Sequence, residues 1–187
     1  MRTFVIDTDT ASDDAVALIL ALRAKDVRVA AITTVAGNVP VAQATRNALY
    51  TAELCGSDVP VFGGADRPLW RKHMHAEWFH GKDGLGDHGY APARRVPEAA
   101  HAVDAILNTI EENPGLTLVT LGPLTTQESG NSSGRSLAAV AYSNTATSSY
   151  LCICRSFVSC RGTCLASSPR HRLTRNAAPD DARNCLK

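Results

Sequence analysis

The pattern of hydrophobic and polar positions predicts alternating strands and helices in the first two-thirds of the chain. Short apolar, β-branched runs have the length of buried strands, and they lie at residues 3–6, 27–35, 61–62 and 116–121. Apolar residues recur at helical spacing at residues 13–25, 41–54 and 97–113. This alternation predicts an α/β fold with a doubly wound, mostly parallel sheet.

Two further local features follow from the same pattern. Ser12 or Asp13 is expected to cap the first helix, because both residue types accept hydrogen bonds from free backbone N–H groups. Residues 66–97 are rich in Gly, His, Trp and Pro and show no clear periodicity. We interpret that segment as a long functional loop of the kind that closes over a substrate.

The pattern is lost after Thr126. Residues 1–126 carry a net charge of −4, whereas residues 127–187 carry +5 and hold five of the six cysteines. We predict no helix or strand–helix alternation in the second stretch, and interpret it as a tail of unknown structure, foreign to the preceding fold. A reading-frame change or wrong gene model after about residue 126 would explain the shift, which makes the predicted fold incomplete.

Composition limits the classes of function. The chain is 44% hydrophobic and 20% charged, which favours a globular domain. The formal net charge of +1 gives no electrostatic case for binding nucleic acid or anionic membranes. No apolar run approaches about 18 residues, and the amino-terminal apolar run is too short for a signal peptide, so we expect a cytoplasmic protein.

Candidate chemistry is concentrated in an acidic cluster after the first predicted strand: Asp7, Asp9, Asp13 and Asp14. Four carboxylates this close repel one another unless a cation or shared protons neutralise them. Calcium or magnesium takes oxygen ligands, so Asp9 and Asp14 could share one ion with a backbone carbonyl from a neighbouring strand end. The plain alternative is a solvated loop whose aspartates cap a helix.

Two enzyme classes fit this cluster. The short string FVIDTDT matches a haloacid dehalogenase-like, magnesium-dependent phosphatase, with Asp7 as nucleophile and Asp9 as general acid and base. That match leaves Asp13 and Asp14 unexplained. The longer string VIDTDTASDDAVAL resembles the signature of the inosine-uridine preferring nucleoside hydrolases. The resemblance continues in order through AITTVAGN, TRNA, VPVFGGADRPL, HGKDGLG and LVTLGPLT, the last ending at Thr125.

The resemblance implies hydrolysis of the N-glycosidic bond of ribonucleosides to ribose and free base, in purine and pyrimidine nucleoside catabolism. Its cofactor would be Ca²⁺, bound by Asp9, Asp14 and the backbone carbonyl of Leu121. Asp9 would also be the base that activates a water on the calcium. Three further residues would contact the substrate: Asp13 and Asn38 at the ribose hydroxyls, and His80 in the closing loop. The partner is then a small ribonucleoside, and homo-oligomerisation is left open.

The chain departs from the family pattern near residue 126. The expected LTN appears as Leu124-Thr125-Thr126, and the family's late His-Asp pair is not recognisable, because His171 is followed by Arg. A calcium site lacking one carboxylate binds weakly, so we expect impaired activity. The non-enzyme alternative is an inactive fragment that binds calcium or ribose.

Two other groups of residues are of types that can bind metal. The cysteines at 152, 154, 160 and 164 could bind zinc, but their spacing is weak evidence compared with paired CxxC motifs. The histidines at 73, 75, 80 and 88 lie in the 66–97 loop among aromatic residues. A metal site is conceivable, a lid with aromatic stacking for a nucleobase fits the family resemblance better, and exposed loop histidines are the plain alternative.

Overall fold

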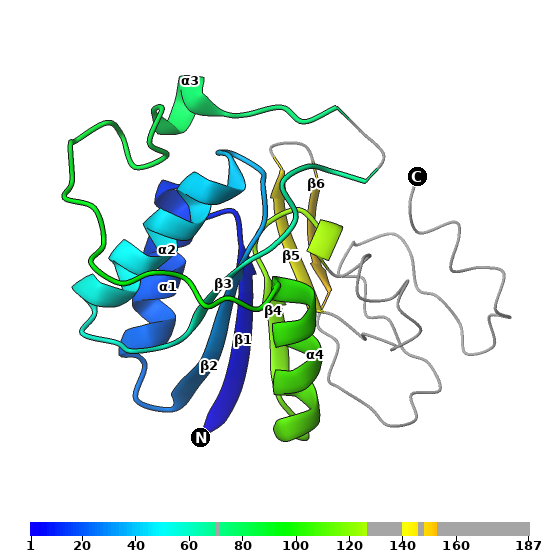
Figure 1. The fold of residues 1–187 in the computed structure, drawn as a ribbon. Helices are drawn as coiled ribbons and strands as arrows, with labels where there is room; N and C mark the ends of the chain where they lie inside the picture. Colours follow the sequence, from blue (N-terminus) through cyan, green and yellow to red (C-terminus); the bar gives the residue numbers. More distant parts are fainter. Residues whose placement is uncertain (70–71, 127–139, 146–147, 153–187) are drawn as a thin grey trace, which may run out of the picture.

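The computed structural model describes residues 1–69, 72–126, 140–145 and 148–152 (Figure 1). Its elements are, in chain order, β1 (Arg2–Thr8), α1 (Ser12–Arg23), β2 (Val27–Thr34), α2 (Val41–Leu54), β3 (Val61–Gly63), α3 (Glu77–His80), α4 (Ala102–Glu112), β4 (Thr117–Thr120), β5 (Val140–Thr145) and β6 (Ser148–Cys152). The predicted alternation of strands and helices is confirmed.

The strands form one sheet in the order β3-β2-β1-β4-β5-β6. β3, β2, β1 and β4 are parallel neighbours, β5 adds parallel to β4, and β6 pairs antiparallel with β5. The chain moves outward from β1 to β3 and then returns to place β4 on the other side of β1. This reversal is the topological switch point of a doubly wound sheet, where ligands bind beyond the carboxyl ends of the strands.

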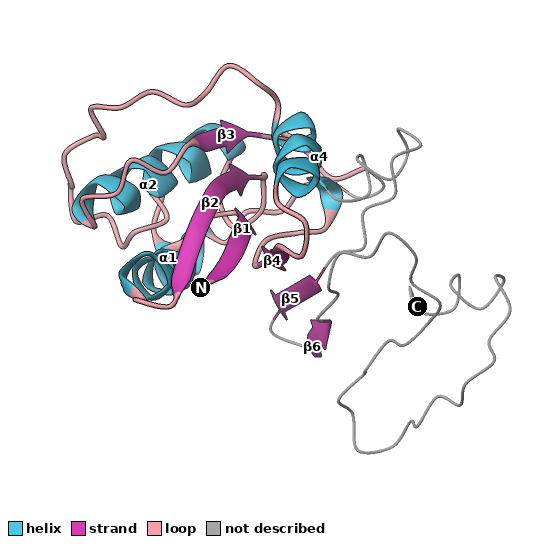
Figure 2. Cartoon of the chain, turned by 90° about the horizontal axis from the view of Figure 1, so that it is seen from below, coloured by secondary structure: helices cyan, strands magenta, loops and turns pink. Residues whose placement is uncertain are grey.

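Helices cover both faces of the sheet (Figure 2). Helices α1 and α2 pack on one face, with Ile6, Leu18 and Ile32 in their shared core, and α4 packs on the other. Neighbouring residues of a strand point to opposite faces, so Val5 joins the α4 core while Ile6 joins the core under α1. Burial on both faces explains the continuous apolar runs. None of the helices in the described part of the chain has the length and apolar character needed to cross a bilayer.

Several boundaries differ from the sequence-based expectation. The predicted cap is wrong: Ala11 is the N-cap of α1 and makes no side-chain bond, so Ser12 and Asp13 belong to the first turn. Helix α4 begins at Ala102, later than predicted, because the preceding residues extend and bridge to β3. The 66–97 loop contains the one-turn helix α3, which is too short to produce a periodic pattern.

Strands β5 and β6 lie in the stretch that we interpreted as a tail of unknown structure. Val140 pairs with Val119 and Ala141 with Thr120, which extends the parallel ladder by one strand. Neither VAYSNT nor SSYLC alternates strictly between polar and apolar residues, so the sequence lacked the usual signal of a half-buried strand. Of the four cysteines weighed as zinc ligands, those after Cys152 lie outside the described residues, as does His171.

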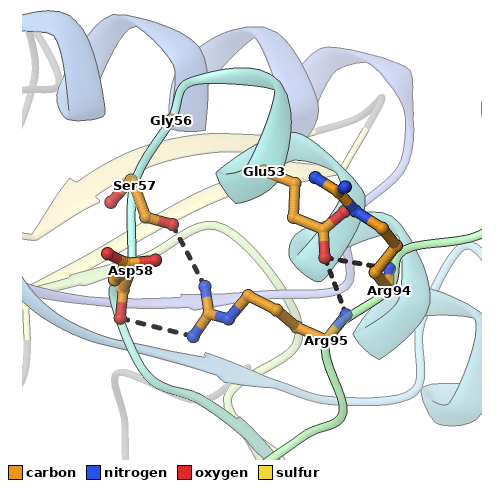
Figure 3. Close-up of a pocket in the computed structure, with 6 residues that line it drawn as sticks. All are labelled: Glu53, Gly56, Ser57, Asp58, Arg94 and Arg95. Atoms are coloured by element: carbon orange, nitrogen blue, oxygen red, sulfur yellow. Dashed lines mark hydrogen bonds between the residues drawn. The ribbon is translucent and has the colours of Figure 1, made fainter.

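One arginine fastens the end of the long 66–97 segment at the amino-terminal side of β3 (Figure 3). The guanidinium of Arg95 donates to the carbonyl oxygens of Ser57, Asp58 and Val59 at 3.1, 3.3 and 2.9 Å. Glu53, at the end of α2, accepts the backbone N–H of Arg95 at 2.7 Å. The carboxyl-terminal end of the 66–97 segment is therefore anchored beside β3, where the chain returns to the sheet.

Replacing Arg95 with Ala is expected to lower the free energy of unfolding by about 1–2 kcal/mol, because three carbonyls lose a charged donor. Chemical denaturation with urea measures the change. Arg94→Ala is the matched control, since Arg94 uses its backbone N–H to bond Glu53 and that group is retained. Equal stability of the two variants would show that the guanidinium contacts do not fasten the segment.

Candidate active site

Two buried carboxylates meet where β1 ends. Asp9 directly follows the strand, and Asp14 lies in the first turn of α1; their exposed fractions are 4% and 7%. The hydroxyl of Thr8 donates to Asp14 Oδ2 at 2.6 Å. The backbone N–H of Asn38 donates to Asp9 Oδ2 at 2.5 Å. The turn between β1 and α1 thus brings together the two aspartates predicted as metal ligands.

The electrostatics of this pair favour a bound cation or proton. Burial, and then the charge of Asp9, raise the pKa of Asp14 from 3.8 to about 8, although the Thr8 hydrogen bond acts in the opposite direction. The ion pairs among the described residues, Arg2–Asp26 and Arg67–Asp66, are at the surface. No described basic side chain therefore forms an ion pair with Asp9 or Asp14.

Gly37 leaves the room that the Asp9 side chain occupies. A Cβ built on Gly37 would lie 2.1 Å from Asp9 Oδ2, far inside van der Waals contact. Gly37 belongs to the AGN sequence after β2, and Asn38 beside it supplies the hydrogen bond to Asp9. A residue without a side chain is therefore required between β2 and α2.

Gly37→Ala is expected to displace the Asp9 carboxylate. If Asp9 ligates calcium, as the resemblance predicts, calcium binding should weaken by about tenfold or more, a loss of roughly 1.4 kcal/mol. Calorimetric titration with calcium measures the affinity. Gly63→Ala is a suitable control, because its added Cβ would meet nothing closer than the Thr45 hydroxyl at 3.8 Å. Unchanged calcium affinity in Gly37→Ala would contradict the placement of Asp9.

The end of β4 lies directly against residues 9–11, which connect β1 to α1 and are called the acidic turn below. The backbone N–H of Leu121 donates to the Asp7 carbonyl at 2.7 Å. A Cβ on Gly122 would come within 2.9 Å of the Asp9 nitrogen, so the two segments are in close backbone contact. The register places Leu121 where a backbone carbonyl could serve the same ion; this role stays a prediction.

The two residues predicted to hold ribose hydroxyls each adjoin one of the carboxylates, because Asp13 precedes Asp14 and Asn38 bonds Asp9. Asp13 is exposed in the first turn of α1, and Asn38 is half-buried after β2. The carbonyl of Asn38 accepts the backbone N–H of Ala76, at the start of α3. Asn38 thus joins the site to the long loop.

The loop that carries α3 lies at the upper end of the molecule in Figure 1, where β1 and β2 finish. His80 is buried, and its Nδ1 lies 2.9 Å from the hydroxyl of Ser12, next to Asp13. The Nε2 of His73 lies 2.9 Å from the Gly37 carbonyl. Trp78 and Phe79 are exposed. The predicted lid therefore contacts the site on both the α1 side and the β2 side.

Thr126 stands where the sequence resemblance predicts Asn. Its side chain is fully buried, and its hydroxyl has no hydrogen-bond partner within the described part of the chain. A buried polar atom without a partner is costly. This observation agrees with the sequence departure at the same residue.

The donor set suits a hard cation. Asp9 and Asp14 supply buried carboxylate oxygens, a ligand type that calcium and magnesium prefer. Across the ranges that the structure describes, no group of three or more His, Cys, Asp or Glu side chains could hold a metal ion. Asp9 and Asp14 are therefore suited to a hard cation only as part of a larger ligand set.

Comparison with known proteins agrees with this arrangement. The family model described as inosine-uridine preferring nucleoside hydrolase matches residues 4–127. The chain belongs to this nucleoside hydrolase family. The match includes every predicted site residue, from Asp9 to Leu121, and it ends where the composition of the chain changes.

Individual relatives give the same family. The chain is 40% identical over 124 residues to uridine nucleosidase 1 of Arabidopsis thaliana, covering 65% of the chain and 37% of the relative. It is 41% identical over 122 residues to the non-specific ribonucleoside hydrolase RihC of Salmonella paratyphi B, covering 65% and 40%. A solved plant nucleoside hydrolase, PpNRh1, superposes with a TM-score of 0.67 at 37% identity, covering 71% of this chain and 43% of that one. The chain thus spans about two fifths of the length of the curated relatives it matches.

Some residues that shape the site were missed as site residues in the sequence. Thr8 binds Asp14, Ser12 binds His80, and Asn47 reaches both the acidic turn and the long loop. Thr8 and Ser12 lie inside the string VIDTDTASDDAVAL, and Asn47 lies inside TRNA. The matched motifs therefore contained all three residues and could have marked them as candidates. Their roles depend on contacts distant in sequence, which periodicity does not reveal.

Proposed function

We propose that the described residues form the amino-terminal part of a calcium-dependent active site that hydrolyses the N-glycosidic bond of ribonucleosides. The observation that carries the proposal is the pair of buried carboxylates, Asp9 and Asp14, at the switch point of the sheet beside Asn38. Residues 1–126 are the hydrolase unit in this proposal. Cytoplasmic nucleoside catabolism is the corresponding role.

The carboxylates of Asp9 and Asp14 and the carbonyl of Leu121 would hold the ion. When bound, calcium supplies positive charge that makes water a better nucleophile and binds the ribose diol. The set offers fewer than the six to eight oxygens that calcium takes. Affinity is therefore expected at the weak end of the range for protein sites, with Kd on the order of 10⁻⁴–10⁻³ M, and hydrolysis is expected to be slow.

The protein groups divide the chemistry among themselves. Asp9 accepts a proton from the attacking water as the oxygen bonds to the anomeric carbon. The glycosidic C–N bond breaks, and the nucleobase leaves with the bonding electron pair. Asp13 and Asn38 orient the ribose, and the nearby carboxylates stabilise the positive charge of the oxocarbenium-like transition state. The loop that carries α3 and His80 would cover the bound substrate and exclude water from it.

The geometry disfavours the phosphatase alternative. Asp7, its nucleophile, lies within β1 with no exposed surface, and its Oδ1 accepts the Thr33 hydroxyl at 2.6 Å. A nucleophilic carboxylate has to reach the phosphorus atom of its substrate. Asp7 is instead a buried structural acceptor between β1 and β2.

The test is to incubate the purified 187-residue chain with inosine, with uridine and with a generic phosphate ester, while calcium and magnesium are varied. We expect slow, calcium-dependent ribose release and no phosphate. Phosphate release that disappears in Asp7→Asn would overturn the proposal in favour of the phosphatase. Calcium binding without ribose release would contradict hydrolysis and indicate an inactive calcium-binding chain.

A further inference from the structure

Asn47 connects three separate segments through one buried side chain. It lies in α2, is 3% exposed, and donates from Nδ2 to the carbonyls of Thr10 at 2.9 Å and Asp83 at 2.8 Å. Its Oδ1 accepts from Gln43, one turn earlier, at 2.9 Å. Both amide hydrogens and the carbonyl oxygen are thus used, and the two hydrogens go to segments 73 residues apart in sequence.

The first of these contacts holds an unusual backbone conformation. Thr10 lies between Asp9 and Asp14 and has a φ of +21°, in a region that residues other than glycine rarely adopt. Its N–H donates to the Thr8 hydroxyl at 2.9 Å, and its carbonyl accepts from Asn47. Such a conformation persists only where surrounding contacts determine it. Asn47 supplies the contact that comes from outside the turn.

The second contact holds the turn at residues 80–87, which begins at the last residue of α3. Asp83 and Asp87 each accept the other's backbone N–H, at 2.9 and 3.0 Å. Gly84 has a φ of +76°, and a Cβ there would lie 2.8 Å from Val39 and 3.1 Å from Asn47 Nδ2. The turn is therefore packed tightly against the Asn47 amide.

We propose that Asn47 is a positioning residue that couples the acidic turn to the 80–87 turn, so that calcium binding at the first orders the second. One amide donates to both turns, so a shift of the Thr10 carbonyl moves the group that holds Asp83. The coupling extends to the loop bearing His80, which also meets Ser12. This inference rests on the proposed calcium site, and it adds a mechanism by which the lid responds to the metal.

Hydrogen exchange of the full chain, with and without calcium chloride, tests the coupling. In the unsubstituted chain we expect saturating calcium to slow exchange in residues 80–87 by roughly tenfold, within the usual range of coupling between sites. In Asn47→Ala, saturating calcium should leave exchange there unchanged. Gln43→Ala is the control, because it removes the bond to Asn47 Oδ1 and retains both donations. Calcium protection of 80–87 in Asn47→Ala equal to that of the unsubstituted chain would overturn the inference.

A calcium-free comparison separates this inference from the proposed function. Without metal, Asn47→Ala should speed exchange in residues 9–11 and 80–87 and leave α4 unchanged; if both turns exchange at the original rate, the inference is wrong. Absence of calcium binding to the unsubstituted chain would instead refute the calcium site. If Asn47→Ala does not fold, Gly84→Ala provides a second test, because it strains the 80–87 turn directly. This variant should weaken calcium binding about fivefold. An unchanged calcium affinity would count against the coupling.

Discussion

Asp14→Asn is expected to make the calcium-free chain more stable at pH 8 and to abolish its stabilisation by calcium. The Asp14 carboxyl is buried beside Asp9, and its pKa in the folded chain is raised from 3.8 to about 8. Asn retains an oxygen that can accept the Thr8 hydroxyl, so the turn keeps its hydrogen bond. The variant removes the negative charge of Asp14. Burial disfavours that charge in the absence of metal, and calcium binding depends on it.

The sign follows from proton linkage. A carboxyl whose folded pKa is raised stabilises the fold fully below its unfolded pKa, and this stabilisation is lost as pH rises through the folded pKa. The calcium-free original chain should therefore lose stability from about pH 4 to pH 8 as Asp14 becomes charged. Asp14→Asn should lack this component of the pH dependence.

Urea denaturation at several pH values, with and without calcium, measures both effects. Calcium at ten times its Kd should stabilise the original chain by about 1.4 kcal/mol and the variant by almost nothing. Asp26→Asn is the control, because Asp26 is an exposed carboxylate paired with Arg2 far from the site. A calcium response in Asp14→Asn equal to that of the original chain would refute the role of Asp14.

Asp9→Asn is expected to reduce ribose release from inosine and uridine by at least about 100-fold, the lower limit for loss of a general base. Asn can still accept the N–H of Asn38, so the turn should remain folded. The amide cannot take a proton from water and contributes no charge to a cation. Single-turnover assays at saturating calcium separate the lost base from weakened metal binding.

Asp13→Asn distinguishes a base from a substrate contact at the same site. Asp13 is exposed and is proposed to hold a ribose hydroxyl, so its replacement should mainly raise KM. A kcat for Asp9→Asn close to that of the original chain would assign the proton transfer to another group.

Much of the architecture could be predicted because it depends on local pattern. The boundaries of α2 were predicted to the residue, since the apolar face of this helix is clear and Pro40 precedes it. Strand β2 was also visible, because burial on both faces requires a continuous apolar run. The start of α4 was placed too early, because residues 97–101 fit a helical pattern while a bridge to Phe62 holds Glu98 extended.

The grouping of the predicted residues followed from the sequence, whereas their contacts did not, and their roles stay predictions. The spacing of the aspartates predicted that Asp9 and Asp14 lie close together, and the structure has them interacting, since only four residues separate them across the β1–α1 connection. The contacts of His80 with Ser12 and of Asn47 with Thr10 join residues 68 and 37 positions apart. No local pattern encodes such contacts, because the sheet topology creates them. The same limit explains why the acidic cluster alone also fitted a phosphatase.

Calorimetric titration of the 187-residue chain with calcium at pH 8 tests the central claim most directly. The account predicts one calcium per chain, with Kd on the order of 10⁻⁴–10⁻³ M, and no detectable binding in the double variant Asp9→Asn/Asp14→Asn. It is contradicted if the original chain binds no calcium up to about 10 mM, or if the double variant binds it equally well.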